Sequence, residues 1–147
     1  MDYCTISFHN LTTHLTNSPM PDHQAPVLPV ANRTVFFVSD GTGITAEAFG
    51  HSVITQFDLK FKQVRLPFID DIEKAEDAVR RINEAFELTG NRPIVFSTLV
   101  KPDLANVIFK SKGLHMDLIQ TFVAPLEEEL GIKSTHTVGR SHNIADT

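Results

Sequence analysis

The stretch VFFVSDGTGITAEAFG, from Val35 to Gly50, decides how the rest of the chain is read. It opens with a β-branched and aromatic apolar run, which is typical of a strand buried on both faces. Two glycines and several candidate capping residues follow, and apolar residues then return with helical spacing. The stretch therefore predicts a strand, a tight turn and a helix in succession.

Strand-like and helix-like segments alternate through the rest of the chain. Further strands are predicted at 61–67, 93–100 and 115–120, and helices follow residue 70, Pro102 and residue 123. The connections are only a few residues long, which favours parallel strands joined through helices. The predicted fold class is therefore α/β, with a parallel sheet of about four strands and covering helices.

The clearest helix follows the second strand, where apolar residues recur at alternating spacings of three and four from residue 72 to residue 86. Asp70 is predicted to cap it, with Glu73 as the capping-box partner, and Gly90 is predicted to end it. Two ion pairs with i,i+4 spacing are predicted on its exposed face: Glu76–Arg80 and Asp77–Arg81.

The domain organisation follows from a shift in composition near residue 32. The chain of 147 residues is about one domain long, and its hydrophobic share of 41% is ordinary for a globular protein. Residues 1–32 are rich in proline and have no sustained period. We predict a disordered leader over 1–32 and one α/β domain over 33–147. A metal-binding or partner-binding tail is the alternative for the leader, although its histidines lack ligand spacing.

Charge and hydropathy narrow the class of function. The formal net charge of −5 argues against a dominant role with nucleic acid or anionic membranes. No apolar stretch approaches the roughly 20 residues of a membrane span. Cys4 is the only cysteine, which suits a reducing compartment, so we predict a cytoplasmic protein. His115, His136 and His142 lack the spacing of a zinc site, and no metal site is predicted.

The turn after the first strand is the candidate ligand site. In α/β proteins, ligands bind outside the carboxyl ends of the strands, where strand order reverses. The free N–H groups and partial positive charge at a helix start favour phosphate or carboxylate. Asp40 is the candidate catalytic residue, although it opposes an anion unless a metal or a substrate hydroxyl faces it. The candidate ligand-binding residues in the turn are Ser39, Gly41, Thr42, Gly43 and Thr45. The same residues also fit a tight turn without a ligand.

Other motifs are weaker. The G-x-G-x-x-A match is a poor dinucleotide fingerprint, because Ser39-Asp40 separates it from the strand. The turn also imitates the phosphate loop of flavodoxins, but the chain has no tryptophan, and its one tyrosine is Tyr3. Near the end, Arg140 and His142 are further candidates for holding a phosphate. The chain contains no P-loop of the form G-x-x-x-x-G-K-[ST].

Several segments together resemble one family. They are VFFVSDGTGITAEAFGHSVITQF, VRLPFID, RPIVFSTLV, LIQTFVAPLEEELG and GRSH. They are similar to the bifunctional kinase–phosphorylase regulators of phosphoenolpyruvate synthase and of pyruvate, phosphate dikinase. The likeness runs from about Arg33 to the end of the chain. The amino-acid sequence around the first turn is more similar to the synthase regulators than to the dikinase regulators.

The resemblance implies a regulatory enzyme. Such proteins phosphorylate a threonine of the target with ADP as donor and remove that phosphate with inorganic phosphate as acceptor. In the family, the nucleotide-binding P-loop lies in the C-terminal half of a chain nearly twice this long. We therefore expect an N-terminal half that lacks the ADP site and is inactive in transfer by itself. In this role Asp40 would orient a hydroxyl or accept its proton.

The implied partner is phosphoenolpyruvate synthase, in preference to pyruvate, phosphate dikinase. Two other functions stay open at this point: a flavodoxin-like flavin-binding electron carrier, and a target-docking module without catalysis. A homo-oligomer also stays open, because the sequence does not determine the oligomeric state.

Overall fold

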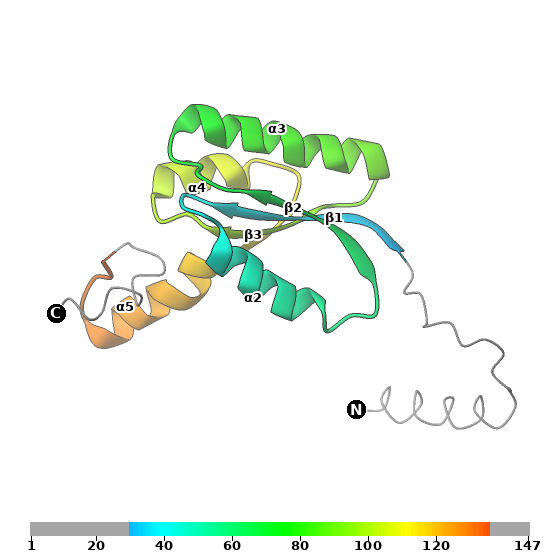
Figure 1. Cartoon of the computed structure of the whole chain (residues 1–147). Helices are drawn as coiled ribbons and strands as arrows, with labels where there is room; N and C mark the ends of the chain where they lie inside the picture. Colours follow the sequence, from blue (N-terminus) through cyan, green and yellow to red (C-terminus); the bar gives the residue numbers. More distant parts are fainter. Residues whose placement is uncertain (1–29, 136–147) are drawn as a thin grey trace, which may run out of the picture.

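The computed structural model describes residues 30–135 and arranges them as a four-stranded sheet between helices (Figure 1). Most of the predicted leader lies outside the described residues, but its last three residues already belong to the first strand. In chain order the elements are β1 (Val30–Ser39), α2 (Ile44–Ile54), β2 (Lys60–Leu66), α3 (Ile72–Thr89), β3 (Ile94–Thr98), α4 (Pro102–Phe109), β4 (Leu114–Asp117), the π-helix η1 (Ile119–Val123) and α5 (Ala124–Leu130).

The sheet is parallel throughout, with strand order β2-β1-β3-β4. The chain passes from β1 to β2 on one side, then crosses back over β1 to place β3 and β4 on the other side. The predicted α/β class and the four parallel strands are confirmed. The strand order reverses between β1 and β3, and this position is where doubly wound folds place their ligands.

The central strand β1 is buried on both faces, as its apolar run predicts. Its side chains alternate, so Val35 and Phe37 pack with α2, whereas Phe36 and Val38 pack with α3 and α4. In Figure 1, α3 and α4 lie on one side of the sheet, and α2 and α5 lie on the other. The described residues therefore form two separate hydrophobic clusters, one on each face.

The close packing of α2 against the sheet depends on a glycine, Gly50. A Cβ added at Gly50 would lie 2.5 Å from a ring carbon of Phe37 and 2.8 Å from one of Phe96. These two rings are stacked with centroids 6.0 Å apart. Gly50 therefore lets the helix backbone approach the aromatic layer directly.

The start of α3 differs from the prediction by one residue. Asp71 is the N-cap, and its Oδ1 accepts a hydrogen bond of 2.7 Å from the amide of Lys74. The predicted cap, Asp70, instead forms an exposed ion pair with the Lys74 ammonium at 2.9 Å. Either aspartate can cap a helix, and Asp71 does so because its own backbone is extended while Ile72 is already helical. The predicted Glu73 capping box is therefore wrong.

The other end and the exposed face of α3 give one confirmation and one correction. Gly90 ends the helix in the left-handed region with φ 75°, as predicted. On the exposed face, Arg80 pairs with Asp77, three residues earlier, and not with Glu76. The i,i+4 pairing pattern is therefore replaced by an i,i+3 pair, a spacing that also brings side chains together on a helix.

The last predicted strand is shorter than expected. β4 ends at Asp117, whose Oδ1 accepts hydrogen bonds from the amides of Ile119 and Gln120. This local capping turns the chain into η1, which the sequence did not indicate, and then into the predicted helix α5. Within residues 30–135, no helix is both long and apolar enough to cross a membrane.

Candidate functional site

The candidate site lies where β1 and β3 end side by side. Ser39 and Thr98 are register partners at the carboxyl ends of these strands. Each follows its strand's α2-facing side chain, Phe37 or Phe96, by two residues, so both point to the α2 face. The β1–α2 turn therefore lies at the point of strand-order reversal, where the sequence analysis placed a ligand.

The turn is built from backbone and hydroxyl contacts. The Ser39 hydroxyl accepts a hydrogen bond of 3.0 Å from the amide of Gly41. Gly43 adopts φ 87°, a conformation that favours glycine, and its carbonyl accepts the first helical bond from Glu47 at 2.9 Å. Gly41 does not adopt positive φ, so only one of the two glycines uses this freedom.

The start of α2 has no side-chain cap, since neither Thr42 nor Thr45 serves as one. The N-cap is Gly43, and the Thr42 hydroxyl only reaches the amide of Ile44, at 3.4 Å. Thr45 is exposed, and among the described residues no hydrogen bond is recorded for its amide. The N-terminus of α2 thus keeps donors available to solvent.

The turn is tied to the segment after β2. The amide of Phe68 donates to the carbonyl of Gly41 at 2.8 Å, and the amide of Ile69 donates to the carbonyl of Ser39 at 2.9 Å. Phe68 has φ 60°, which is uncommon for a non-glycine residue. These two hydrogen bonds hold the β1–α2 turn against the β2–α3 loop and limit its movement.

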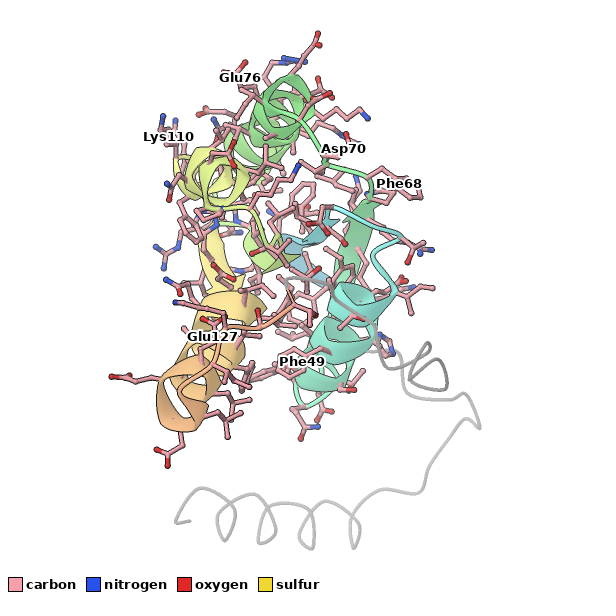
Figure 2. The ribbon with its side chains drawn as sticks, turned by 90° about the vertical axis from the view of Figure 1, so that its left-hand side faces the viewer. Phe49, Phe68, Asp70, Glu76, Lys110 and Glu127 are labelled. Atoms are coloured by element: carbon pink, nitrogen blue, oxygen red, sulfur yellow. The ribbon has the colours of Figure 1, made fainter. Side chains whose placement is uncertain are left out.

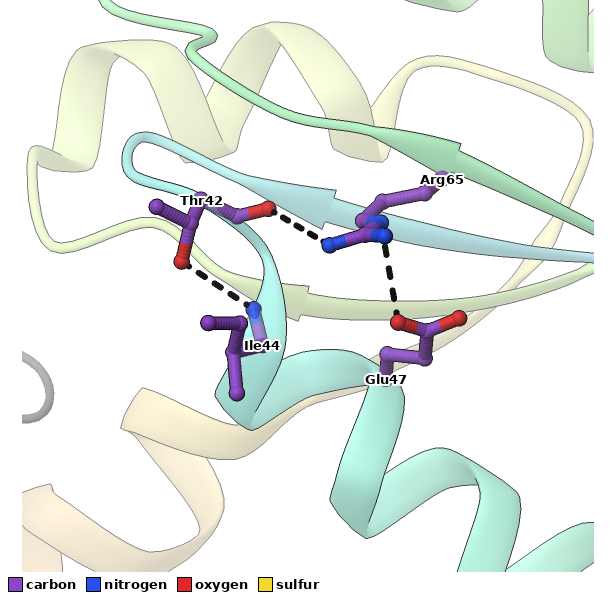
Figure 3. A network of polar contacts seen from close by, with 4 residues as sticks. All are labelled: Thr42, Ile44, Glu47 and Arg65. Atoms are coloured by element: carbon purple, nitrogen blue, oxygen red, sulfur yellow. Dashed lines mark hydrogen bonds and ion pairs between the residues drawn. The ribbon is translucent and has the colours of Figure 1, made fainter.

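Arg65 is a site residue that the sequence analysis missed. Its guanidinium donates to the carbonyl of Thr42 at 3.3 Å and lies 3.5 Å from a carboxylate oxygen of Glu47 (Figure 3). Its side chain also covers Gly43, where an added Cβ would lie 2.8 Å from the Arg65 Cδ. The side chains of Arg65 and Glu47 are 44% and 42% exposed. Arg65 therefore places a solvent-accessible positive charge beside the start of α2.

The position of Arg65 explains why it was missed. It is the penultimate residue of β2, and it is paired in register with Phe37 of β1. Only this parallel pairing brings it beside the β1–α2 turn. The sequence did show a cation near the end of the second predicted strand. That cation indicates a site residue only when β2 is known to lie beside β1.

Two further polar groups lie at the same edge of the sheet. The half-buried Asp40 accepts a long hydrogen bond of 3.4 Å from the amide of Val100, which joins the loops after β1 and β3. Thr98 is 1% exposed, and its hydroxyl has no hydrogen-bond partner in the described structure. A buried hydroxyl without a partner is unusual and costly. The Thr98 hydroxyl therefore leaves an unused hydrogen-bonding group at this edge of the sheet.

A cavity of about 260 Å³ lies at the carboxyl end of β2, next to the turn. Its lining includes three cationic residues, Arg65, Lys74 and Arg81, and the acidic Asp77. The hydrogen bond from Lys74 lowers the pKa of Asp70 below its ordinary value, and the same contact raises the pKa of Lys74. The lining of the cavity thus carries charges of both signs, with three cations and one carboxylate.

The remaining predicted site residues, Arg140 and His142, lie outside the described residues. Across residues 30–135, no three histidine, cysteine, aspartate or glutamate side chains gather as metal ligands would. The structure therefore brings Ser39, Asp40, Gly43 and Thr42 together around one turn and adds Arg65 to them.

Comparison with known proteins assigns the chain to a family. The family model for kinase/pyrophosphorylase proteins matches residues 35–147. The chain is also similar to proteins provisionally named phosphoenolpyruvate synthase regulatory protein. The one from Herminiimonas arsenicoxydans is 72% identical over 115 residues, and the one from Janthinobacterium sp. (strain Marseille) is 70% identical over 119 residues. A third, from Ralstonia nicotianae, is 55% identical over 115 residues.

These matches cover 78%, 81% and 78% of this chain but only 41%, 42% and 41% of the respective relatives. The chain thus spans about two fifths of the length of the curated relatives that it matches. The family model nevertheless covers the second half of β1 and every described element after it, including the β1–α2 turn. The chain belongs to the kinase/pyrophosphorylase family.

Proposed function

We propose that this chain contributes a phosphate-binding part of a bifunctional regulator of phosphoenolpyruvate synthase. In this activity, ADP phosphorylates a threonine of the target, and inorganic phosphate later removes that phosphoryl group as pyrophosphate. The β1–α2 turn holds inorganic phosphate or the phosphothreonine of the target. The ADP site lies outside this chain, which contains no P-loop.

One observation carries the proposal: the start of α2 presents donors without firm partners at the point of strand-order reversal. The amide of Thr45 has no hydrogen-bond acceptor among the described residues, and the amide of Ile44 reaches only the Thr42 hydroxyl, at 3.4 Å. A helix N-terminus in this state favours an anion. The unpartnered buried hydroxyl of Thr98 on the same face of the sheet supports the same location.

Arg65 supplies the positive charge that the phosphate needs. Phosphoryl transfer depends mainly on positioning and on charge stabilisation. Without an anion, Arg65 faces Glu47 across 3.5 Å. We expect a bound phosphate to compete with Glu47 for this guanidinium, because a charge-assisted bond to phosphate is stronger than a long, half-exposed ion pair.

Binding is tested on the chain of 147 residues itself. Inorganic phosphate is titrated into ¹⁵N-labelled protein while the amide resonances are followed by NMR. We expect the largest shifts at residues 41–46, an affinity about tenfold weaker for Arg65→Gln, and a tighter affinity for Glu47→Gln. Arg80→Gln is the matched control, because Arg80 is an exposed cation of α3 that does not line the cavity. Unchanged amide resonances at residues 41–46, together with shifts at another surface, would refute the phosphate site.

Activity is tested in a chimera, in which residues 35–147 of this chain replace the matched segment of the Herminiimonas relative. We expect Thr42→Ala combined with Thr45→Ala to slow both ADP-dependent phosphorylation of phosphoenolpyruvate synthase and its phosphate-dependent reversal by about tenfold or more. Thr55→Ala, an exposed threonine at the other end of α2, is the control. Unchanged rates in both directions would assign the turn a structural role only.

The family membership favours this regulator over a flavodoxin-like electron carrier. A target-docking module stays compatible with it, because one domain can both bind the target and position its phosphate. Capture of phosphoenolpyruvate synthase by a chimera that has lost transfer in both directions would favour docking as the main role of this domain.

A further inference from the structure

The helical segment formed by η1 and α5 carries an apolar stripe that is at least half exposed. Phe122, Leu126 and Leu130 follow one another at intervals of four residues and are 50%, 56% and 62% exposed. Residues four apart lie on the same face of a helix. Ile132, just after the helix, is 65% exposed and extends the stripe.

The same segment is poorly anchored to its own domain. Neither η1 nor α5 contains a buried residue, and the contacts of α5 are mainly with η1, the helical turn directly before it in the chain. α5 is only seven residues long, and helices of this length are not stable in water without tertiary packing. Within residues 30–135, no element covers Leu126 and Leu130 well enough to bury them.

The stripe continues onto α2. The rings of Phe122 and Phe49 meet edge to face with centroids 5.6 Å apart, and Phe49 in turn contacts Phe96 of the core. Figure 2 shows Phe49 on the side of α2 that faces α5. We call the surface formed by Phe49, Phe122, Leu126, Leu130 and Ile132 the α5 face. Contiguous apolar surfaces of this kind mark interaction sites.

Two glutamates flank the stripe on α5: Glu129, which is exposed, and Glu127, whose Oε2 accepts a hydrogen bond of 2.8 Å from the amide of Ser134. Glu128 lies on the opposite side of α5, where it lines a cavity of about 510 Å³ with Gln120. A partner that fits the α5 face is therefore apolar at its centre and basic at its rim.

We propose that the α5 face is the docking surface for the part of the full-length family proteins that lies outside the matched segment. The relatives carry well over half of their length outside that segment, and the family match continues past α5 to residue 147. A second copy of this chain is disfavoured, because a symmetric contact through α5 would bring two rows of glutamates together. The α5 face is thus an interface between two parts of one regulator.

Hydrogen exchange tests this proposal in the full-length chimera described above. We expect amides of residues 122–132 to exchange about tenfold more slowly in the chimera than in the 147-residue chain, whereas amides of α3 exchange at similar rates in both. Equal exchange at 122–132 in both proteins would overturn the proposal. So would protection in the 147-residue chain that rises with its concentration, because a second copy would then cover the face.

A pair of variants connects the protection to the stripe itself. Leu126→Ser in the chimera should abolish most of the added protection, and Leu130→Ser should do the same. Leu88→Ser is the matched control, because Leu88 is 86% exposed on α3, away from the α5 face. Protection that survives both stripe variants would refute this surface. The proposal is independent of the phosphate site, because exchange at 122–132 is measured without phosphate or target.

Discussion

The two faces of the sheet differ in how completely they are covered. On one face, α3 and α4 enclose a cluster of twelve buried residues that includes Ile82 and Ile108, both fully buried. On the other face, α2 covers a cluster of six, while η1 and α5 lie beside it without a buried residue of their own. Most of the packing that stabilises the domain is therefore on the α3/α4 face.

The difference in burial matches the place of the two proposed binding surfaces. The α3/α4 face is closed, and burial of apolar side chains there is the main stabilising contribution. The proposed phosphate site at the start of α2 and the proposed docking surface on α5 both lie on the α2 face. Binding regions of proteins are commonly drawn from the less stable parts of a fold.

The largest expected effect compares a core position with an exposed one. Ile82→Ala should lower the free energy of unfolding by about 2–5 kcal/mol, because it leaves a cavity under α3. Leu126→Ala should change it by less than about 0.5 kcal/mol in the 147-residue chain. Urea denaturation followed by circular dichroism measures both. Similar costs for the two variants would show that α5 is packed in solution and would remove the contrast between the faces.

The second prediction concerns the contact of α2 with the sheet. Gly50→Ala should destabilise the protein by about 1–3 kcal/mol, because its methyl group would overlap the rings of Phe37 and Phe96. Alanine is otherwise favoured in helices by about 1 kcal/mol over glycine, so the sign of the change separates packing from helix propensity. Ser52→Ala on the exposed side of α2 is the control. A stabilising Gly50→Ala would mean that α2 lies more loosely than described.

The third prediction compares the two helix starts. Asp71→Ala should lower the free energy of unfolding by about 1 kcal/mol, because the Lys74 amide loses its acceptor. Thr42→Ala should cost less than about 0.5 kcal/mol, since α2 begins at a glycine without a side-chain cap. Thermal denaturation of both variants checks this order. The reverse order would show that Thr42 is a structural cap and would weaken its assignment to ligand binding.

The smallest effect is a dependence on pH from the α3/α4 face. Burial lowers the pKa of His115 below its ordinary value of 6.5, and its Nδ1 has no partner among the described residues. The unfolded chain therefore binds a proton more readily, so stability is complete above pH 6.5 and falls as the pH drops toward the lowered pKa. His115→Gln should therefore flatten this slope. Urea midpoints of the parent protein and the variant, measured across this pH range, test the expectation, and equal slopes would contradict it.

The sequence by itself determined the class of fold and the place of its central turn. The apolar run before Ser39 and the periodic pattern of α3 predict their elements, because strand and helix periodicity are local properties of the chain. The motif around Gly41 and Gly43 likewise carried the family resemblance. Even the end of α3 at Gly90 follows from a local requirement for positive φ.

Only the tertiary structure decided which distant groups meet. Arg65 joins the candidate site because β2 lies beside β1, and strand order is not written in local periodicity. Whether Asp70 or Asp71 caps α3 depends on where the backbone leaves its extended conformation. The exposure of Phe122, Leu126 and Leu130 was likewise decided by the tertiary structure, because the burial of a helix face depends on the elements that pack against it.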